Sequence, residues 1–208
     1  MIIGVTGSMQ SGKQELGHIW KALGGYRFVD LNDFVDEVHR RDRDGFYAGL
    51  SLMPFLDEQG HETLTYYQML GEVEGLHAQA QAHELAYVQE RLAQLLTNTS
   101  KNERVVLSWG YAYQLMQRGL NFDHMFVFQS DTGVWCDRIR RAFQRLGWKG
   151  DLPTDRAVMQ FAATLELDPV MVLSTVRDRM PRYHTIIDTS PSDWGEANLR
   201  ANLAGLGW

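Results

Sequence analysis

The feature that decides the fold is the stretch Ile2-Ile3-Gly4-Val5-Thr6-Gly7-Ser8-Met9-Gln10-Ser11-Gly12-Lys13-Gln14 near the start of the chain. Ile2 to Thr6 is apolar and β-branched, which is typical of a short buried strand. Gly7 to Lys13 fits G-x-x-x-x-G-K, the first seven positions of the phosphate-binding loop pattern. Apolar residues at helical spacing follow from about 14 to 23. The motif therefore has the strand–loop–helix context that it requires.

The loop residues have separable roles in anion binding. Gly7 and Gly12 let the backbone bend so that successive N–H groups point at an anion. The following helix presents its N-terminal N–H groups and the positive end of its dipole to the same anion. Lys13 places a compact positive charge between the terminal phosphates. We therefore predict a phosphate-binding site made of Gly7, Ser8, Gln10, Ser11, Gly12, Lys13 and Gln14.

Gln14 departs from the usual pattern. Ser or Thr is expected there, and its hydroxyl normally ligates Mg²⁺, a hard cation that prefers oxygen. The Gln14 amide oxygen is a longer and weaker ligand, and we predict that it holds Mg²⁺ directly or through water. Phosphate binding by the loop does not need this contact.

Apolar runs alternate with helical patterns along the whole chain, which predicts a three-layer α/β fold with a mostly parallel sheet and helices on both faces. Strands are predicted at 2–6, 27–30, 104–109, 125–128 and 185–188. Helices are predicted over 14–23, from 32 or 33 onward, and over 78–96, 113–118, 134–146, 169–179 and 194–203. Residues 40–75 give no clear pattern. With 208 residues and no evident linker, we predict a single domain over 1–208.

Composition narrows the functional classes. The 20 basic and 26 acidic side chains give a formal net charge of −6, which argues against general nucleic-acid binding because that needs a basic surface. A single cysteine, Cys136, excludes an internal disulfide, and no Cys/His group has zinc-ligand spacing. No basic leader or apolar run of membrane length is present, so we predict a cytoplasmic protein without a membrane partner.

Taken with the loop, the chain resembles dephospho-CoA kinase, a small P-loop kinase of the nucleoside monophosphate kinase group. The opening MIIGVTGSMQSGKQ is close to that family's usual start, and residues 29–33 fall where it carries Asp-x-Asp near the acceptor hydroxyl. Ala82-His83-Glu84 lies where it carries a His-Pro pair, and residues 105–110 where a strand ends in Asp-x-Pro. The basic helix from Cys136 to Arg145 resembles its lid. This chain departs from the family's motifs at three of these positions. Asn32 replaces the second Asp, Ser108 replaces an acidic residue, and Thr189 replaces an Asn that lies near the adenine in the family.

The resemblance implies a P-loop NTPase fold, ATP and Mg²⁺ as cofactors, a small nucleotide-like acceptor, and a helical lid insertion at about 136–170. It also implies an acceptor-binding role for His83. The alternative is that His83 is a surface or packing residue of an Ala/Gln-rich helix and binds no ligand.

Other site residues follow from their positions in the predicted fold. Asp30 ends the second predicted strand, and α/β ligand sites lie at the carboxyl ends of strands. We therefore predict that it is the catalytic carboxylate on the acceptor side, with Asp33 in reserve. The structural alternative is that Asn32 or Asp33 caps the next helix. Trp109 ends the predicted strand at 104–109 and Tyr111 follows it; both are predicted to line the acceptor pocket, with core packing as the alternative.

Arginines at three- and four-residue spacing supply positive charge on one face of the predicted lid helix. Arg138 is predicted to bind ATP and Arg141 to stabilise the transferred phosphoryl group, because the planar arginine fork matches phosphate oxygens. The alternative is a solvated basic helix surface.

Three other functions stay open on the sequence. Phage-type deoxynucleoside monophosphate kinases resemble the same fold and often lack the hydroxyl after the loop lysine. A catalytically impaired nucleotide-binding module would explain several substituted positions together. A P-loop hydrolase acting as a switch is disfavoured, because Val105 to Ser108 lacks the acidic end of a Walker B strand. The sequence does not indicate an oligomeric state.

Overall fold

The structure is a computed structural model that describes residues 1–13, 17, 19–20, 22, 25–63, 66, 69–70, 73, 75–100, 102–148, 151–180, 182–191, 194–205 and 207. The chain divides into two compact units. The first consists of Met1–Asp30, Ser100–Ile139 and Glu166–Trp208, and the second of Leu31–Thr99 and Arg140–Leu165. The prediction of a single domain with a lid at 136–170 stays a prediction.

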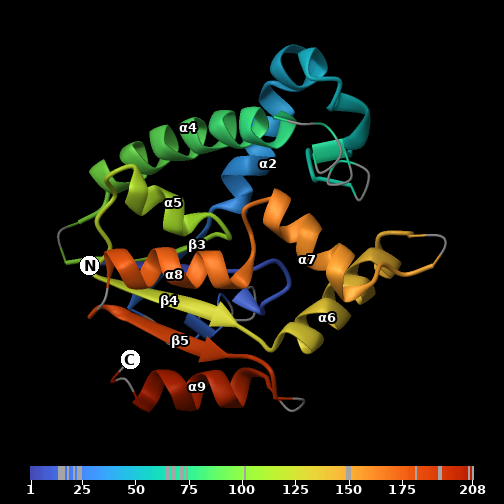
Figure 1. The fold of residues 1–208 in the computed structure, drawn as a ribbon. Coiled ribbons are helices and arrows are strands. Elements are labelled where there is room, and N and C mark those ends of the chain that lie inside the picture. The colour runs from blue at the N-terminus through green and yellow to red at the C-terminus, as the bar shows by residue number, and fades with distance from the viewer. Residues whose placement is uncertain are drawn as a thin grey trace. The chain divides into compact units, whose positions relative to one another are not determined.

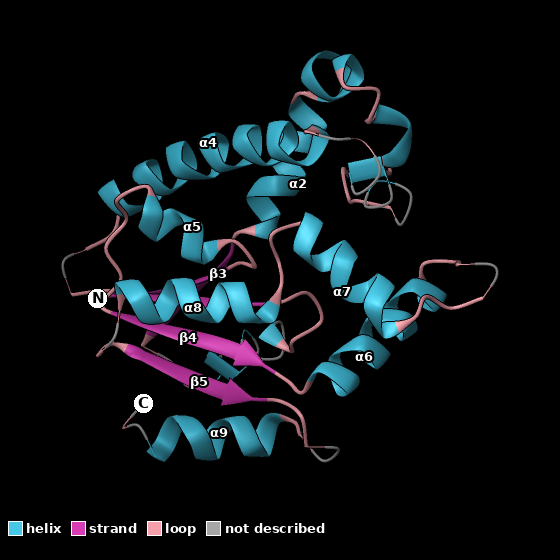
Figure 2. Cartoon of the chain, in the orientation of Figure 1, coloured by secondary structure: helices cyan, strands magenta, loops and turns pink. Residues whose placement is uncertain are grey.

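The first unit contains a five-stranded parallel sheet, as predicted from the alternating pattern (Figure 2). Its order is β2-β3-β1-β4-β5. All five predicted strands are confirmed within two residues at each end: β1 Ile2–Gly7, β2 Tyr26–Asp30, β3 Arg104–Ser108, β4 His124–Gln129 and β5 His184–Asp188. Because β1 lies in the centre of a parallel sheet, the loop after it emerges between the carboxyl ends of β3 and β4.

One face of the sheet carries the main apolar core. Alternate residues of the strands, with Ile3 and Val5 of β1 at the centre, pack against two helical segments. One segment follows β1, where residues 13, 17, 19, 20 and 22 are helical, and contributes the fully buried Trp20. The other is α9 (Glu196–Gly205), which contributes Leu199 and Leu203. Each fully buried large apolar side chain stabilises the fold by about 1.5–3 kcal/mol, which holds the start of the chain firmly on the sheet.

The opposite face is covered by α5 (Ala112–Gln117) and α8 (Pro169–Arg179), which both contact β1. In Figure 1 these two helices lie on one side of the sheet and α9 lies on the other. Asp168 caps α8, since its Oδ1 accepts from the backbone N–H groups of Val170 and Met171. Pro169 takes the first helical position, where a missing N–H costs nothing. The three-layer α/β prediction is confirmed.

The second unit is mainly helical. It contains α2 (Asn32–Arg41), a π-helical turn at Arg43–Tyr47, a 3-10 turn at Met53–Phe55, α4 (Leu76–Thr97) and α7 (Asp155–Thr164). Helix α6 (Thr132–Arg145) begins in the first unit and ends in the second. The π and 3-10 turns fall within residues 40–75, where short irregular turns leave no sequence period to detect.

The start of α2 differs from the capping alternative for its first residues. Leu31 takes the N-cap position, and no side chain makes a capping hydrogen bond there. Asp33 lies exposed in the first turn, where its charge favours the helix dipole.

No single helix in the described part of the chain is long and apolar enough to cross a membrane. Only α7 and α8 together, as a pair bent by 44°, have the length and composition of a broken span.

Candidate functional site: the loop after the first strand

The loop after β1 has the backbone geometry of a tight anion cradle. Gly7 has φ +146° and Gly12 has φ +91°, in the region that favours glycine. A Cβ on Gly7 would lie 2.4 Å from the carbonyl oxygen of Phe128 on β4, so only glycine fits against the neighbouring strand. Gln10 also has a positive φ, of 57°. Two of these three positions are the glycines from which the sequence pattern predicted the bend.

The Lys13 side chain folds back over this loop. Its Nζ donates hydrogen bonds to the carbonyl oxygens of Gly7 (2.9 Å) and Ser8 (2.6 Å) and to Ser11 Oγ (3.3 Å). Three donors of one ammonium group are therefore directed at the loop, which places the positive charge at the carboxyl end of β1.

Burial and one carboxylate set the protonation of Lys13. Loss of water around the ammonium lowers the pKa of Lys13 from 10.5 to about 8, and the negative charge of Asp30 acts in the opposite direction. Asp30 ends β2, so the structure brings together the predicted phosphate-binding lysine and the predicted catalytic carboxylate within the first unit. Below about pH 8 Lys13 carries its charge.

This pKa predicts a pH dependence of nucleotide binding. Anion binding needs the protonated ammonium, and at pH 9 only about one molecule in ten keeps it when the pKa is about 8. We expect the affinity for ATP to fall about tenfold between pH 7 and pH 9, as measured by titration calorimetry. In Lys13→Arg the side chain stays charged throughout, so its profile reports only the titration of the nucleotide. A wild-type profile identical to that of the arginine variant would contradict the assignment.

Two buried hydroxyls near this loop have no hydrogen-bond partner among the described residues. Ser8 follows β1 and is 1% exposed, and Ser130 follows the neighbouring strand β4 and is 6% exposed. A buried hydroxyl without a partner costs about 1–3 kcal/mol. A phosphate oxygen accepting from the Ser8 hydroxyl would remove that cost, so the loop residues fit a phosphate ligand. Gln14, the predicted Mg²⁺ ligand, lies outside the described residues.

The first half of α6 is tied to the loop and to β5 by two side chains. Trp135 is fully buried, and its Nε1 donates to the carbonyl oxygen of Met9 in the loop (2.7 Å). Arg138 donates to Thr189 Oγ1 (2.9 Å) and to the Thr189 carbonyl oxygen. The structure thus places Arg138 beside the residue that follows β5. Its predicted contact with ATP stays a prediction.

The other predicted residues of the first unit lie beyond β3. Trp109 is buried, at 3% exposed, and its ring meets that of Tyr111 edge to face at 5.3 Å. Gly110, between them, accepts a hydrogen bond from Thr6 Oγ1 (2.8 Å), which anchors this turn to β1. The burial of Trp109 fits the core-packing alternative, whereas the partly exposed Tyr111 has surface to offer a ligand.

Asp33, His83 and Arg141 belong to the second unit. Arg141 is exposed on α6. His83 lies on α4, where its Nε2 is 2.7 Å from Asp42 Oδ2, and its ring stacks on Phe46 at 3.9 Å. Hydrogen bonds from Arg41 and His83 lower the pKa of Asp42 against the effect of burial. His83 thus has a defined partner, and its predicted role in acceptor binding stays a prediction.

Sequence reasoning missed several of these contacts. Ser130, Trp135 and Asp42 carry no motif, and their importance depends on which strand ends and helices lie side by side. The signal available is that Ser130 lies two residues after the predicted buried strand at 125–128, because positions near the carboxyl ends of such strands cluster at ligand sites.

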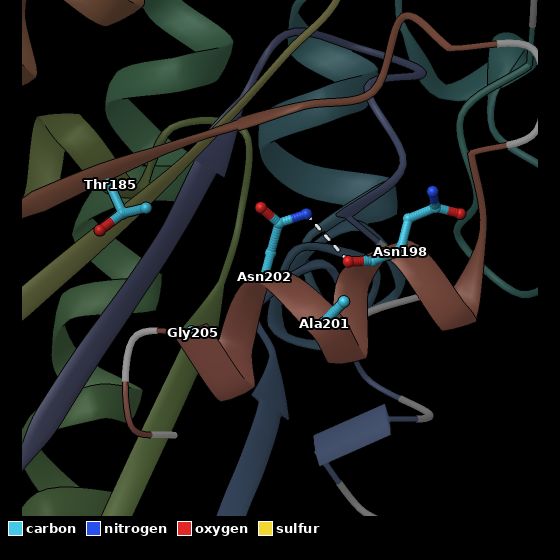
Figure 3. Close-up of a pocket in the computed structure, with 5 residues that line it drawn as sticks. All are labelled: Thr185, Asn198, Ala201, Asn202 and Gly205. Carbon is cyan, nitrogen blue, oxygen red and sulfur yellow. Dashed lines mark hydrogen bonds between the residues drawn. The ribbon is translucent and has the colours of Figure 1, made fainter.

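A surface pocket lies at the other end of β5 (Figure 3). It is lined by Thr185 and by residues of α9: Asn198, Ala201, Asn202 and Gly205. Thr185 is the second residue of β5, so this pocket is remote along the strand from its carboxyl end. None of the five lining residues is charged, and the pocket therefore offers no cation for phosphate.

Comparisons with known proteins support the fold. No protein-family model matches the sequence, and no curated protein sequence matches it significantly. Among solved structures, the chain is similar to TT1252 from Thermus thermophilus, with 20% identity, a TM-score of 0.52, and coverage of 100% of this chain and 96% of that one. It is also similar to dephospho-CoA kinase from Campylobacter jejuni, with 13% identity, a TM-score of 0.55, and coverage of 99% and 94%. At these identities the likeness shows a shared α/β fold.

Proposed function

We propose that this protein is an ATP-dependent kinase that transfers the γ-phosphoryl group to a small nucleotide-like acceptor. The observation that carries the proposal is the Lys13 ammonium, held over the glycine loop by Gly7, Ser8 and Ser11 and within electrostatic reach of Asp30. A cation and a carboxylate at the carboxyl ends of β1 and β2 are the two groups that phosphoryl transfer asks of the protein.

The predicted site residues divide this work. ATP with Mg²⁺ supplies the phosphoryl group when bound. Lys13 and the loop N–H groups hold the phosphates and stabilise the charge that develops on their oxygens. Asp30 orients the acceptor hydroxyl and takes its proton. Arg138 and Arg141 add positive charge from α6 as a lid, and Gln14 ligates Mg²⁺.

Dephospho-CoA is our first proposal for the acceptor, and a deoxynucleoside monophosphate is the alternative. The first is supported by the order of motifs along the chain. The alternative is supported by Gln14, since a hydroxyl is often missing at that position in the phage-type enzymes. Asp33, His83, Trp109 and Tyr111 are the proposed acceptor contacts.

A substrate panel tests the proposal. ATP and Mg²⁺ are incubated with the protein and either dephospho-CoA or each nucleoside monophosphate, and ADP release is measured against a no-acceptor blank. Release that depends on one acceptor identifies the substrate. Tight ATP binding without ADP release on any acceptor would instead favour a catalytically impaired nucleotide-binding module. ADP release at the same rate with and without an acceptor would indicate a hydrolase.

A further inference from the structure

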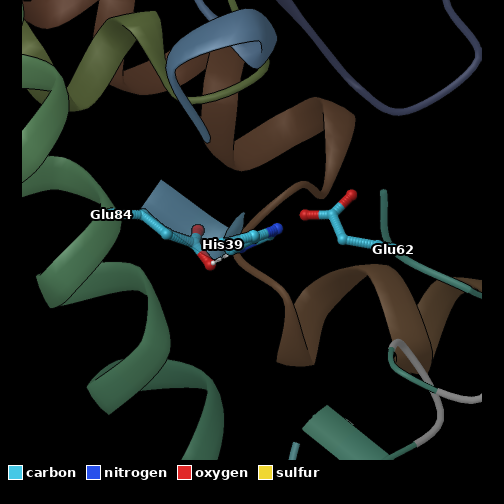
Figure 4. Close-up of side chains that lie close together, drawn as sticks. All are labelled: His39, Glu62 and Glu84. Atoms are coloured by element: carbon cyan, nitrogen blue, oxygen red, sulfur yellow. Dashed lines mark hydrogen bonds and ion pairs between the residues drawn. The ribbon is translucent and has the colours of Figure 1, made fainter. Parts of the chain in front are cut away.

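The second unit contains a buried cluster of one histidine and two glutamates (Figure 4). His39 lies on α2, Glu84 on α4, and Glu62 in the segment after Gly60. His39 is 0% exposed and Glu84 6%, whereas Glu62 is half-buried. One possible ligand atom from each residue lies within 4.8 Å of the other two. Three elements distant in sequence thus direct a nitrogen and two oxygens at one point.

The hydrogen bonds of His39 match those of a metal-binding histidine. Its Nδ1 is 2.8 Å from the carbonyl oxygen of Gly60, an oxygen that only accepts, so Nδ1 carries a proton. Metal-binding histidines usually donate one ring N–H to a carbonyl or carboxylate in this way, which leaves the other nitrogen for the ion. The other nitrogen, Nε2, is 3.0 Å from Glu84 Oε1.

Two tyrosines surround the carboxylates. Tyr66 OH donates to Glu84 Oε1 (3.0 Å), which orients that carboxylate as an outer ligand partner would. Tyr47 is fully buried, and its hydroxyl has no hydrogen-bond partner among the described residues. The Tyr47 ring meets that of His39 edge to face, with 4.7 Å between the centroids, and burial and the charges of Glu84 and Glu62 raise the pKa of Tyr47. The unpartnered hydroxyl beside His39 is an independent sign of a missing ligand in this cluster.

We propose that His39, Glu62 and Glu84 bind a divalent first-row transition metal ion, with Zn²⁺ as its representative. Imidazole nitrogen favours such ions over Mg²⁺, and carboxylate oxygens complete a common zinc ligand set. Ligands of one Zn²⁺ lie about 3–4 Å apart, so the three side chains need only a small inward movement. The proton of His39 Nε2 passes to solvent as the ion binds.

The ion would have a structural role in the second unit. The segment bearing Glu62 is joined to the preceding turn by the Leu56–Glu62 bridge, and Gly60 packs closely on Asp36 of α2. An ion held by His39, Glu62 and Glu84 ties this segment to α2 and α4. The site is separate from the loop after β1, and the inference does not rest on the proposed kinase activity.

The test is Zn²⁺ binding to the chelator-stripped, full-length protein, followed by calorimetry and thermal unfolding. We expect one Zn²⁺ per chain and a rise in Tm. Glu62→Gln is expected to weaken Zn²⁺ binding at least about 100-fold and to abolish the rise in Tm. Mutating residues that only hydrogen-bond to metal ligands already lowers metal affinity by up to about 100-fold, and Glu62 would be a ligand itself. Without metal, its Tm should lie close to that of the wild type, because losing the attraction of Glu62 for protonated His39 is offset by losing its repulsion of Glu84. Glu58→Gln makes the same change at an exposed position of the same loop and should bind Zn²⁺ as the wild type does.

Further variants locate the ion. His61 is exposed and lies 3.0 Å from Asp57 and 3.4 Å from Asp36, which makes it the neighbouring alternative. His61→Gln should keep Zn²⁺ binding, and the visible absorption of Co²⁺ in place of Zn²⁺ should disappear in Glu62→Gln only. Lys13→Met should bind Zn²⁺ normally, whatever its effect on ATP. Loss of binding in His61→Gln but not in Glu62→Gln would overturn the proposal. No uptake by the wild type would identify the cluster as a buried His39–Glu84 ion pair alone.

Discussion

Lys13→Met is expected to abolish ATP binding and, at the same time, to make the ligand-free protein more stable. The low pKa of Lys13, about 8, means that the folded state holds this charge at a cost below pH 8, and the cost disappears as pH rises toward 10.5. The shift corresponds to at most about 3 kcal/mol. Methionine also lacks the hydrogen bonds to the Gly7 and Ser8 carbonyls, and their loss lowers the free energy of unfolding by about 1–2 kcal/mol. The net gain in unfolding free energy at pH 7 is about 1–2 kcal/mol.

Urea unfolding and ATP titration of the same preparation measure both effects. Arg200→Met is the matched control, because it removes a partly exposed cation on α9 whose ion pair with Glu196 lies at the surface. Both quantities should stay at wild-type values there. A Lys13→Met protein that is less stable than the wild type would show that the loop hydrogen bonds outweigh burial. One that binds ATP normally would remove the basis of the proposed site.

Asp30→Asn is expected to lower kcat about 10²–10⁴-fold while changing the Kd for ATP only a few-fold. The amide keeps the size of the carboxylate but accepts no proton from the acceptor hydroxyl. Because the Asp30 charge supports the protonated form of Lys13, the substitution also lowers the pKa of Lys13 further. The fall of ATP affinity with pH should therefore begin at a lower pH than in the wild type. A merely structural role for Asp30 would not predict this combination.

Asp33→Asn is the comparison for this variant. Asp33 lies three residues later and is exposed in the first turn of α2. If Asp30 is the proton acceptor, Asp33→Asn keeps kcat within a few-fold and raises the KM of the acceptor at most. The reverse pattern, with kcat lost in Asp33→Asn alone, would transfer the catalytic role to Asp33. Equal losses of turnover and ATP affinity in Asp30→Asn would exclude a specific catalytic role for Asp30.

Local patterns predicted the elements of the sheet because they are local in origin. An apolar β-branched run such as Val105–Leu107 needs two covered faces wherever it lies, and its length indicates a strand. Gly7 and Gly12 likewise mark a bend that other residues cannot make. Between about 40 and 75 the chain instead forms a π turn and a 3-10 turn. Side chains there contact α4, as Asp42 contacts His83, and such contacts leave no periodic pattern of apolar residues in the sequence.

By itself, the amino-acid sequence determined the strand–loop–helix unit at the start of the chain and the parallel α/β sheet, and it predicted Lys13 as the phosphate-binding cation. Those conclusions follow from periodicity and from backbone freedom, which act over a few residues. Tertiary structure alone decided that Asp30 acts on the charge of Lys13, that Trp135 holds the loop at Met9, and that His39, Glu62 and Glu84 share one buried point. These residues are 17 to 126 positions apart, and only strand order and helix packing bring such distant groups together.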